Sequence, residues 1–116
     1  MSSNFVKNPG NLQNLFNEIK DKKLSPVDLI KSYISRINET QKDIEQWKSY
    51  DFEKAIETAK LREQQVIDNN ILGPLHGIPV GIKDIIHVEG FKTEFNCKAF
   101  KDTEVLKLDS GVVLAL

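Results

Sequence analysis

The sequence predicts an α/β domain, and two observations carry that prediction. Residues 11–70 place apolar side chains at helical spacing, whereas residues 73–90 hold four glycines and two prolines among mostly β-branched apolar residues. The first pattern is typical of amphipathic helices, and the second is typical of turns around a short buried strand. A chain of 116 residues is long enough for one modest core, so we expect no more than one domain.

Two helices are predicted before residue 40. The first covers about residues 11–20, where one stripe is formed by Leu12, Leu15, Phe16 and Ile19. The second begins at Ser25, a capping serine followed by a proline at the first helical position, and its apolar stripe continues to about Glu39. Leu24 and Leu29 occupy the two positions of a hydrophobic staple, which supports this start.

A third helix is predicted from near Asp51 to Asp68. Its inward side chains are expected to be Phe52, Ala55, Ile56, Ala59, Val66 and Ile67. Asn69 and Asn70 follow, and asparagine tolerates the left-handed backbone that often ends a helix. Trp47 and Tyr50, just before this helix, are interpreted as packing residues.

The second half predicts less regular structure. A short buried strand is expected near Ile78 to Asp84, and only loops or short irregular elements from Lys92 to Leu108. Asp109 and Ser110 form a plausible cap for a helix that begins in residues 109–116. Because an isolated helix needs about 12–15 residues to be marginal in water, we expect the sequence to be the N-terminal part of a longer domain.

Composition and charge exclude several classes of protein. Sixteen basic and seventeen acidic residues give a net charge of −1, whereas a dedicated nucleic-acid binder usually carries a basic excess. No apolar run approaches roughly 18 residues, and the N-terminus lacks the apolar stretch of a signal peptide. A single cysteine, Cys97, cannot form an internal disulfide. We therefore expect a cytoplasmic protein without direct nucleic-acid or membrane partners.

The run GPLHGIPVGIKD, residues 73–84, resembles the opening motif of the amidase signature family. These enzymes are serine hydrolases that cleave or transfer amide nitrogen. The resemblance spans nearly the whole chain, although its specific core is these twelve residues. It implies an α/β amidase-signature fold, in which N-terminal helices are followed by the first strands of a mixed sheet. Residues 1–116 would then be the N-terminal part of one amidase domain, with a helical segment at about 11–70, a strand and loop segment at about 73–108 and the next helix from 109.

The resemblance also implies a serine–cis-serine–lysine triad in which Lys83 is the catalytic lysine. A serine hydroxyl is a poor nucleophile unless a nearby base accepts its proton. A lysine is a base only when neutral, and burial favours its neutral form, so the resemblance predicts that Lys83 is enclosed. In a strand, Gly81 and Lys83 share one face and Asp84 lies on the other. Asp84 is therefore assigned a supporting structural role, and Gly81 would let backbone or substrate approach closely.

The sequence departs from the family in one respect. The Gly/Ser-rich loop that supplies both serines and the oxyanion-binding amides of these enzymes has no counterpart among its serines, which are Ser2, Ser3, Ser25, Ser32, Ser35, Ser49 and Ser110. We therefore expect the nucleophile to lie outside these residues and the chain alone to be inactive.

Other candidate residues receive structural interpretations. From spacing alone, Lys83 would be a solvated lysine at a strand end, and only the motif favours catalysis. His76 and His87 are eleven residues apart without a ligand cluster, so His76 is expected to serve packing or a turn rather than a metal. Cys97 has no basic partner nearby in sequence and is expected to be a buried or half-buried thiol. No metal or organic cofactor is indicated.

Three functional hypotheses remain from the sequence. The first is an amidase that hydrolyses a small-molecule amide, with Lys83 as its only site residue in this chain. The second is the amidase subunit of a tRNA-dependent amidotransferase, which would hydrolyse glutamine and pass ammonia to partner subunits. The third is a non-catalytic, truncated interaction module. Either copies of the same chain or amidotransferase subunits are the expected protein partners.

Overall fold

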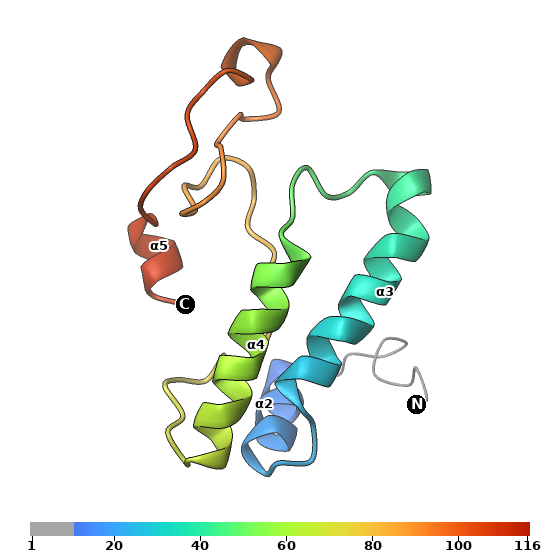
Figure 1. Cartoon of the computed structure of the whole chain (residues 1–116), viewed down its shortest axis with the longest axis vertical. Helices are drawn as coiled ribbons and strands as arrows, with labels where there is room; N and C mark the ends of the chain where they lie inside the picture. The colour runs from blue at the N-terminus through green and yellow to red at the C-terminus, as the bar shows by residue number, and fades with distance from the viewer. Residues whose placement is uncertain (1–10) are drawn as a thin grey trace. The chain divides into compact units, whose positions relative to one another are not determined.

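The computed structural model describes residues 11–116. Its elements in chain order are α2 (Leu12–Lys20), α3 (Pro26–Ile44), α4 (Phe52–Ile67), the 3-10 turn η1 (Lys98–Phe100) and α5 (Gly111–Leu114) (Figure 1). The described chain divides into two compact units. Unit 1 comprises residues 11–46 and 50–79, and unit 2 comprises residues 47–49 and 80–116.

The predicted helix starts in unit 1 are confirmed by their capping hydrogen bonds. Asn11 accepts the Asn14 N–H at the start of α2, and Asp51 accepts the Lys54 N–H at the start of α4. At the start of α3 the Ser25 hydroxyl accepts the N–H groups of Val27 and Asp28 and donates to the Glu63 carboxylate. The cap of α3 is therefore also a link to α4.

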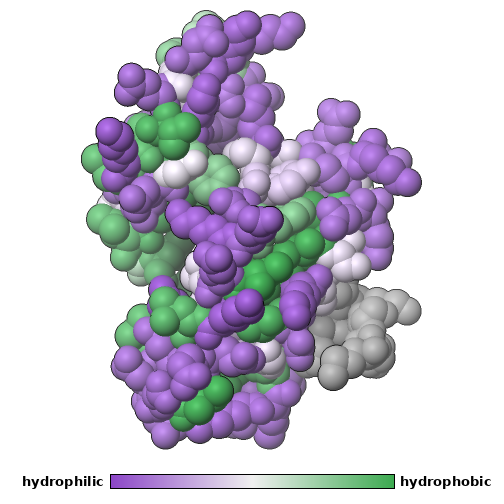
Figure 2. All heavy atoms as spheres, viewed as in Figure 1, coloured by the Kyte–Doolittle hydropathy of each residue, from purple (hydrophilic) through white to green (hydrophobic). Residues whose placement is uncertain are grey.

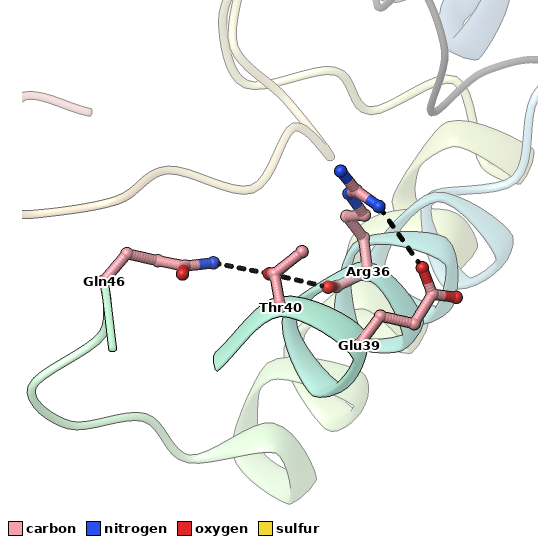
Figure 3. A network of polar contacts seen from close by, with 4 residues as sticks. All are labelled: Arg36, Glu39, Thr40 and Gln46. Atoms are coloured by element: carbon pink, nitrogen blue, oxygen red, sulfur yellow. Dashed lines mark hydrogen bonds and ion pairs between the residues drawn. The ribbon is translucent and has the colours of Figure 1, made fainter. Parts of the chain in front are cut away.

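α3 is longer than the sequence pattern indicates, because it ends at Ile44 rather than near Glu39. Its end is formed by Glu45, whose backbone is left-handed and whose N–H donates to the Gln41 carbonyl. Thr40 reinforces the last turns, since its hydroxyl donates to the Arg36 carbonyl at 2.9 Å and accepts from the Gln46 amide at 2.8 Å (Figure 3). The apolar stripe of α3 therefore marks only its buried part, and the last turns are supported by these polar contacts.

The core of unit 1 lies where the three helices meet. α3 and α4 run antiparallel and side by side (Figure 1). One cluster packs α2 against the start of α3 and the end of α4, and it consists of Leu15, Ile19, Leu24, Leu29 and Val66. A second cluster lies between α3 and α4 and consists of Val27, Ile30 and Ala59. Both residues of the predicted staple, Leu24 and Leu29, are buried. The prediction for Ile67 is wrong, because its side chain is 54% exposed.

Unit 2 is built mainly of turns, and the strand predicted for residues 78–84 is not present: residues 11–116 contain no assigned strand. A strand is defined by a ladder to a neighbour, and the described residues supply none along this segment. Elsewhere in unit 2 the Gly90 N–H donates to the Leu106 carbonyl and the Leu106 N–H donates to the Phe91 carbonyl, but these residues are not part of an assigned strand. The expectation of irregular structure for residues 92–108 is confirmed, with η1 as the one short element there.

The C-terminal helix starts at the predicted place but without the predicted side-chain cap. Ser110 occupies the N-cap position of α5, yet its hydroxyl makes no capping hydrogen bond. The Asp109 carboxylate instead accepts the Glu89 N–H at 2.7 Å, and the Ser110 N–H donates to the His87 carbonyl at 3.0 Å. These two bonds hold the start of α5 to the segment that follows Lys83.

Apolar side chains are exposed on unit 2. Figure 2 shows hydrophobic atoms gathered around α5, and the exposed large residues there include Val105, Leu108, Val112, Leu114 and Leu116. Among the described residues, no helix combines the length and apolar character needed to cross a bilayer.

Candidate active site

Lys83 lies on the exposed side of a segment with alternating exposure. From Gly81 to Glu89 exposed and half-buried residues alternate one by one, although the backbone turns at residues 84–86. The Lys83 side chain is exposed, so the described residues do not provide the enclosure predicted for it. Its carbonyl accepts the N–H groups of Ile85 at 2.8 Å and Ile86 at 3.0 Å. Lys83 therefore begins a tight turn.

Asp84 makes the largest set of hydrogen bonds in this region. Its carboxylate oxygens accept the N–H of Glu94 at 3.0 Å and the N–H of Asn96 at 3.3 Å. Its main-chain carbonyl accepts the N–H between them, that of Phe95, at 3.1 Å. Three consecutive amides thus bind one residue. This agrees with the supporting structural role predicted for Asp84, on the half-buried side opposite Lys83.

Trp47 and Lys48 contact residues of unit 2 that are distant in sequence. A Cβ atom on Gly81 would lie 3.0 Å from the Trp47 indole, so a side chain packs where the sequence predicts an approach of backbone or substrate. The Lys48 ammonium lies 3.5 Å from the Glu94 carboxylate. Both contacts join residues more than thirty positions apart, and no local signal in the sequence indicates them.

The first part of the motif belongs to unit 1 and is fixed by His76. This side chain is buried; its Nδ1 accepts the Leu72 N–H at 3.3 Å and its Nε2 lies 2.9 Å from the Arg62 carbonyl. Only the neutral Nε2–H tautomer satisfies both bonds. The predicted packing role of His76 is confirmed, and it holds the motif to the last turns of α4.

The two remaining candidate residues are His87 and Cys97. The His87 Nδ1 is 2.9 Å from the hydroxyl of the buried Thr93. Cys97 is exposed, so its prediction as a buried or half-buried thiol is wrong; it lies at the start of η1, outside both apolar clusters. Over residues 11–116, no three His, Cys, Asp or Glu side chains converge as metal ligands would.

The serines with defined contacts support helices rather than Lys83. Ser25 caps α3, and the Ser32 hydroxyl donates to the Leu29 carbonyl at 2.8 Å. Ser110 precedes α5. Within the described residues the site therefore consists of an exposed lysine on a turn, an aspartate that binds three amides, and an indole packed on Gly81.

Comparison with known proteins identifies the class to which this lysine-bearing motif belongs. The family model described as Amidase matches residues 28–116, which include the whole motif, and the chain belongs to the amidase family.

Among curated proteins the chain is similar to subunits of glutamyl-tRNA(Gln) amidotransferase from Staphylococcus aureus. The protein of strain bovine RF122 / ET3-1 is 35% identical over 91 residues, which is 78% of this chain and 19% of the relative. Those of strains JH9 and Newman are 38% identical over 82 residues, 71% of this chain and 17% of each relative. The chain therefore spans less than a fifth of the length of these relatives. No solved structure matches it.

Proposed function

We propose that this chain supplies the catalytic lysine, Lys83, of an amidase-type serine hydrolase that acts on carbon–nitrogen bonds. The observation that carries the proposal is the twelve-residue motif ending in Lys83 and Asp84, which lies inside the segment matched by the amidase family. The two serines of the triad are proposed to come from residues outside these 116.

In the proposed reaction, a serine Oγ attacks the amide carbonyl carbon. Its proton passes to the cis-serine oxygen, whose own proton passes to the neutral Lys83 amine. The C–N bond then breaks, and the leaving nitrogen takes up a proton from the relay, so that an acyl-enzyme and free amine or ammonia result. Water hydrolyses the ester by the same relay and restores the serine. A base is required because the serine hydroxyl is otherwise a poor nucleophile at neutral pH, and in this proposal the Lys83 amine is that base.

The proposal makes two structural demands on the rest of the enzyme. Lys83 is exposed in residues 11–116, so further parts of the enzyme have to enclose it and favour its neutral form. Residues 78–84 also need neighbouring strands before they can form part of the sheet proposed for an α/β amidase. The exposure of residues 81–83, which alternates before the turn, suits such pairing.

A second candidate function is favoured by the names of the relatives. Each of the matched Staphylococcus aureus proteins is named as one subunit of a glutamyl-tRNA(Gln) amidotransferase. If this chain shares that role, its amide substrate is glutamine and the ammonia passes to partner subunits. Comparison of kcat/KM for glutamine with kcat/KM for aliphatic and aromatic amides separates this function from that of a general amidase.

The test is amide hydrolysis by the complete product of the gene that encodes these residues. We expect Lys83→Ala and Lys83→Arg to lower kcat by about 10²- to 10⁴-fold, the usual contribution of a general base. Arginine keeps the positive charge but does not lose its proton. Lys107→Ala, which removes another exposed lysine of unit 2, should leave kcat within about twofold of the unaltered enzyme.

Trapping of the intermediate adds a second readout. Hydroxylamine should convert the acyl-enzyme to a hydroxamate, and this product should disappear with Lys83→Ala. Full activity in that variant would refute the assignment of Lys83. A complete gene product that folds, binds a partner and hydrolyses no amide would refute the enzymatic proposal in favour of an interaction module.

A further inference from the structure

The turn at residues 94–96 is closed by a bond from the Cys97 N–H to the Glu94 carbonyl at 2.9 Å, and its three amides bind Asp84. The three N–H groups in sequence, those of Glu94, Phe95 and Asn96, donate to Oδ1, the main-chain carbonyl and Oδ2 of Asp84, respectively. A single residue therefore supplies every acceptor for three successive amides. Two of these bonds are made by a carboxylate, and hydrogen bonds to a charged acceptor are stronger than neutral ones.

The backbone of this turn is unfavourable without such support. Phe95 has φ of 53° and Asn96 has φ of 50°, so two consecutive residues other than glycine adopt the left-handed region. Left-handed backbone brings Cβ close to the following carbonyl oxygen, and asparagine tolerates this better than a bulky residue does. Phe95 is thus the more strained of the two. Its ring packs edge-on against Phe100, with centroids 5.2 Å apart.

The same bonds constrain Lys83, because Asp84 follows it directly. The peptide unit that joins the two residues carries the Lys83 carbonyl, which accepts the N–H groups of Ile85 and Ile86. Rotation of the Asp84 backbone away from the 94–96 turn would rotate this peptide unit and break the Lys83 turn. Glu94 extends the support, since its carboxylate pairs with Lys48, next to the indole that packs on Gly81.

We propose that Asp84 is a positioning residue for Lys83. By binding three amides of a strained turn it fixes the backbone from which the Lys83 side chain projects, and it does so without contact with the amine. The catalytic part of this inference rests on the proposed function, whereas the backbone part concerns the chain alone.

Amide hydrogen exchange on the full chain tests the backbone part. Asp84→Ala should speed exchange at Ile85 and Ile86 by at least about tenfold, because loss of the carboxylate loosens the Lys83 turn. These two amides report on that turn, since their N–H groups bind the Lys83 carbonyl and not the aspartate side chain. Asp84→Asn keeps one acceptor oxygen and should give a smaller increase. Asp102→Ala, at an exposed aspartate of the same unit, is the matched control and should change neither rate. Unchanged exchange at both isoleucines in Asp84→Ala would overturn the inference.

A rescue experiment distinguishes positioning through the turn from a general loss of stability. Glycine adopts left-handed backbone without a steric penalty, whereas alanine does not. In the Asp84→Ala background, Phe95→Gly should therefore restore most of the exchange protection, and Phe95→Ala should not. Both variants lose the contact with Phe100, so that the difference between them reports the backbone alone. Equal behaviour of the two double variants would contradict action through the turn.

Kinetics of the complete gene product test the catalytic part. Asp84→Ala should lower kcat at least about tenfold per folded molecule and change KM by less than about threefold, and Phe95→Gly should recover part of kcat. If Lys83→Ala is inactive but Asp84→Ala keeps full kcat, the positioning role is wrong although the proposed function stands. If Lys83→Ala is active while the exchange effect persists, the proposed function fails and the backbone role of Asp84 is supported.

Discussion

Single residues of the 73–84 motif meet different physical demands. Gly77 has φ of 79°, and a Cβ atom there would lie 2.9 Å from the Pro26 ring, so both its backbone and its space require glycine. Gly81 accommodates the Trp47 indole. Gly73, in contrast, has open space around it and no left-handed backbone. One family motif therefore contains glycines of unequal importance to the fold.

This contrast predicts the effect of alanine at the two positions in unit 1. Gly77→Ala should lower the free energy of unfolding by about 1–3 kcal/mol, because it combines left-handed backbone with a steric clash. Gly73→Ala, the matched control, should change it by less than about 0.5 kcal/mol. Urea denaturation followed by circular dichroism gives both values. Equal destabilisation by the two variants would show that the left-handed backbone of Gly77 is not what matters.

Sequence reasoning at the residue scale succeeds where the partner is near in the chain. The cap at Ser25 and the turn role of His76 follow from local patterns, and both have hydrogen bonds that confirm them. Ile67 fails because Val66, its neighbour in the last turn of α4, takes the position in the apolar cluster, whereas Ile67 lies on another side of the helix and is exposed. Cys97 fails because burial of a thiol depends on tertiary surroundings rather than on its own sequence.

At the scale of elements, the start of α3 carries more than a helix cap. The Ser25 hydroxyl accepts two backbone N–H groups and uses its own proton to bind Glu63 on α4. Pro26, which follows, is fully buried and touches the space beside Gly77. The beginning of α3, the last turns of α4 and the motif turn are thus connected within unit 1.

Removal of the Ser25 hydroxyl should therefore cost more than a typical surface substitution. Ser25→Ala loses both capping bonds and the bond to Glu63, and we expect the free energy of unfolding to fall by about 1–2 kcal/mol. Ser35→Ala, within the same helix and at an exposed position, should alter it by less than about 0.5 kcal/mol. Thermal and urea denaturation of the two variants provide the comparison. A loss for Ser25→Ala no larger than that for Ser35→Ala would contradict the capping role.

The elements that could be predicted are those with complete local signals. All three helices have an apolar stripe in sequence, the second also has a capping serine, and the third is followed by two asparagines; each begins close to its predicted start. The strand predicted at residues 78–84 rests on apolar residues between glycines and prolines, and such a segment becomes a strand only beside a partner. The end of α3 depends on contacts among Arg36, Thr40 and Gln46, which alternation and stripe counting do not detect.

At the scale of the whole chain, the apolar core is distributed unevenly. Every buried apolar side chain of the described residues lies in unit 1, in clusters formed by α2, α3 and α4. In the described part of unit 2 the one buried polar residue is Thr93, and many large apolar side chains are exposed. Stability should follow this distribution, because buried apolar area is the main source of folding free energy.

Native-state hydrogen exchange should reveal two levels of protection in the full chain. We expect amides in the middle of α3 and α4 to exchange only through global unfolding, and amides of residues 85–110 to exchange at least about a hundredfold faster through local opening. Fragmentation mass spectrometry or NMR resolves the two groups. Protection in residues 85–110 equal to that in α4 would show that unit 2 has a stable core that its burial does not suggest.

In the candidate site, neighbouring residues could be predicted from the sequence, whereas contacts between distant residues could not. Motif resemblance singles out Lys83. The expected separation of Asp84 from Lys83 agrees with their exposure, although the chain turns at Asp84 instead of forming the predicted strand. The contacts of Gly81 and Asp84, on either side of Lys83 in sequence, come from residues 47 and 94–96, which are distant in the chain. Such contacts depend on how turns close in three dimensions, and a single sequence does not encode them in a form that spacing rules recover.

The antiparallel pairing of α3 and α4 also has a consequence for the order of folding. A connection of only seven residues, 45–51, joins the two helices, so their first contacts form at a small cost in loop-closure entropy. The bonds that hold unit 2 together bridge longer stretches, such as the twenty positions between Glu89 and Asp109. Contacts of low sequence separation form fastest. During synthesis, α3 and α4 would therefore pair as a helical hairpin before the segment that carries Lys83 forms its turn.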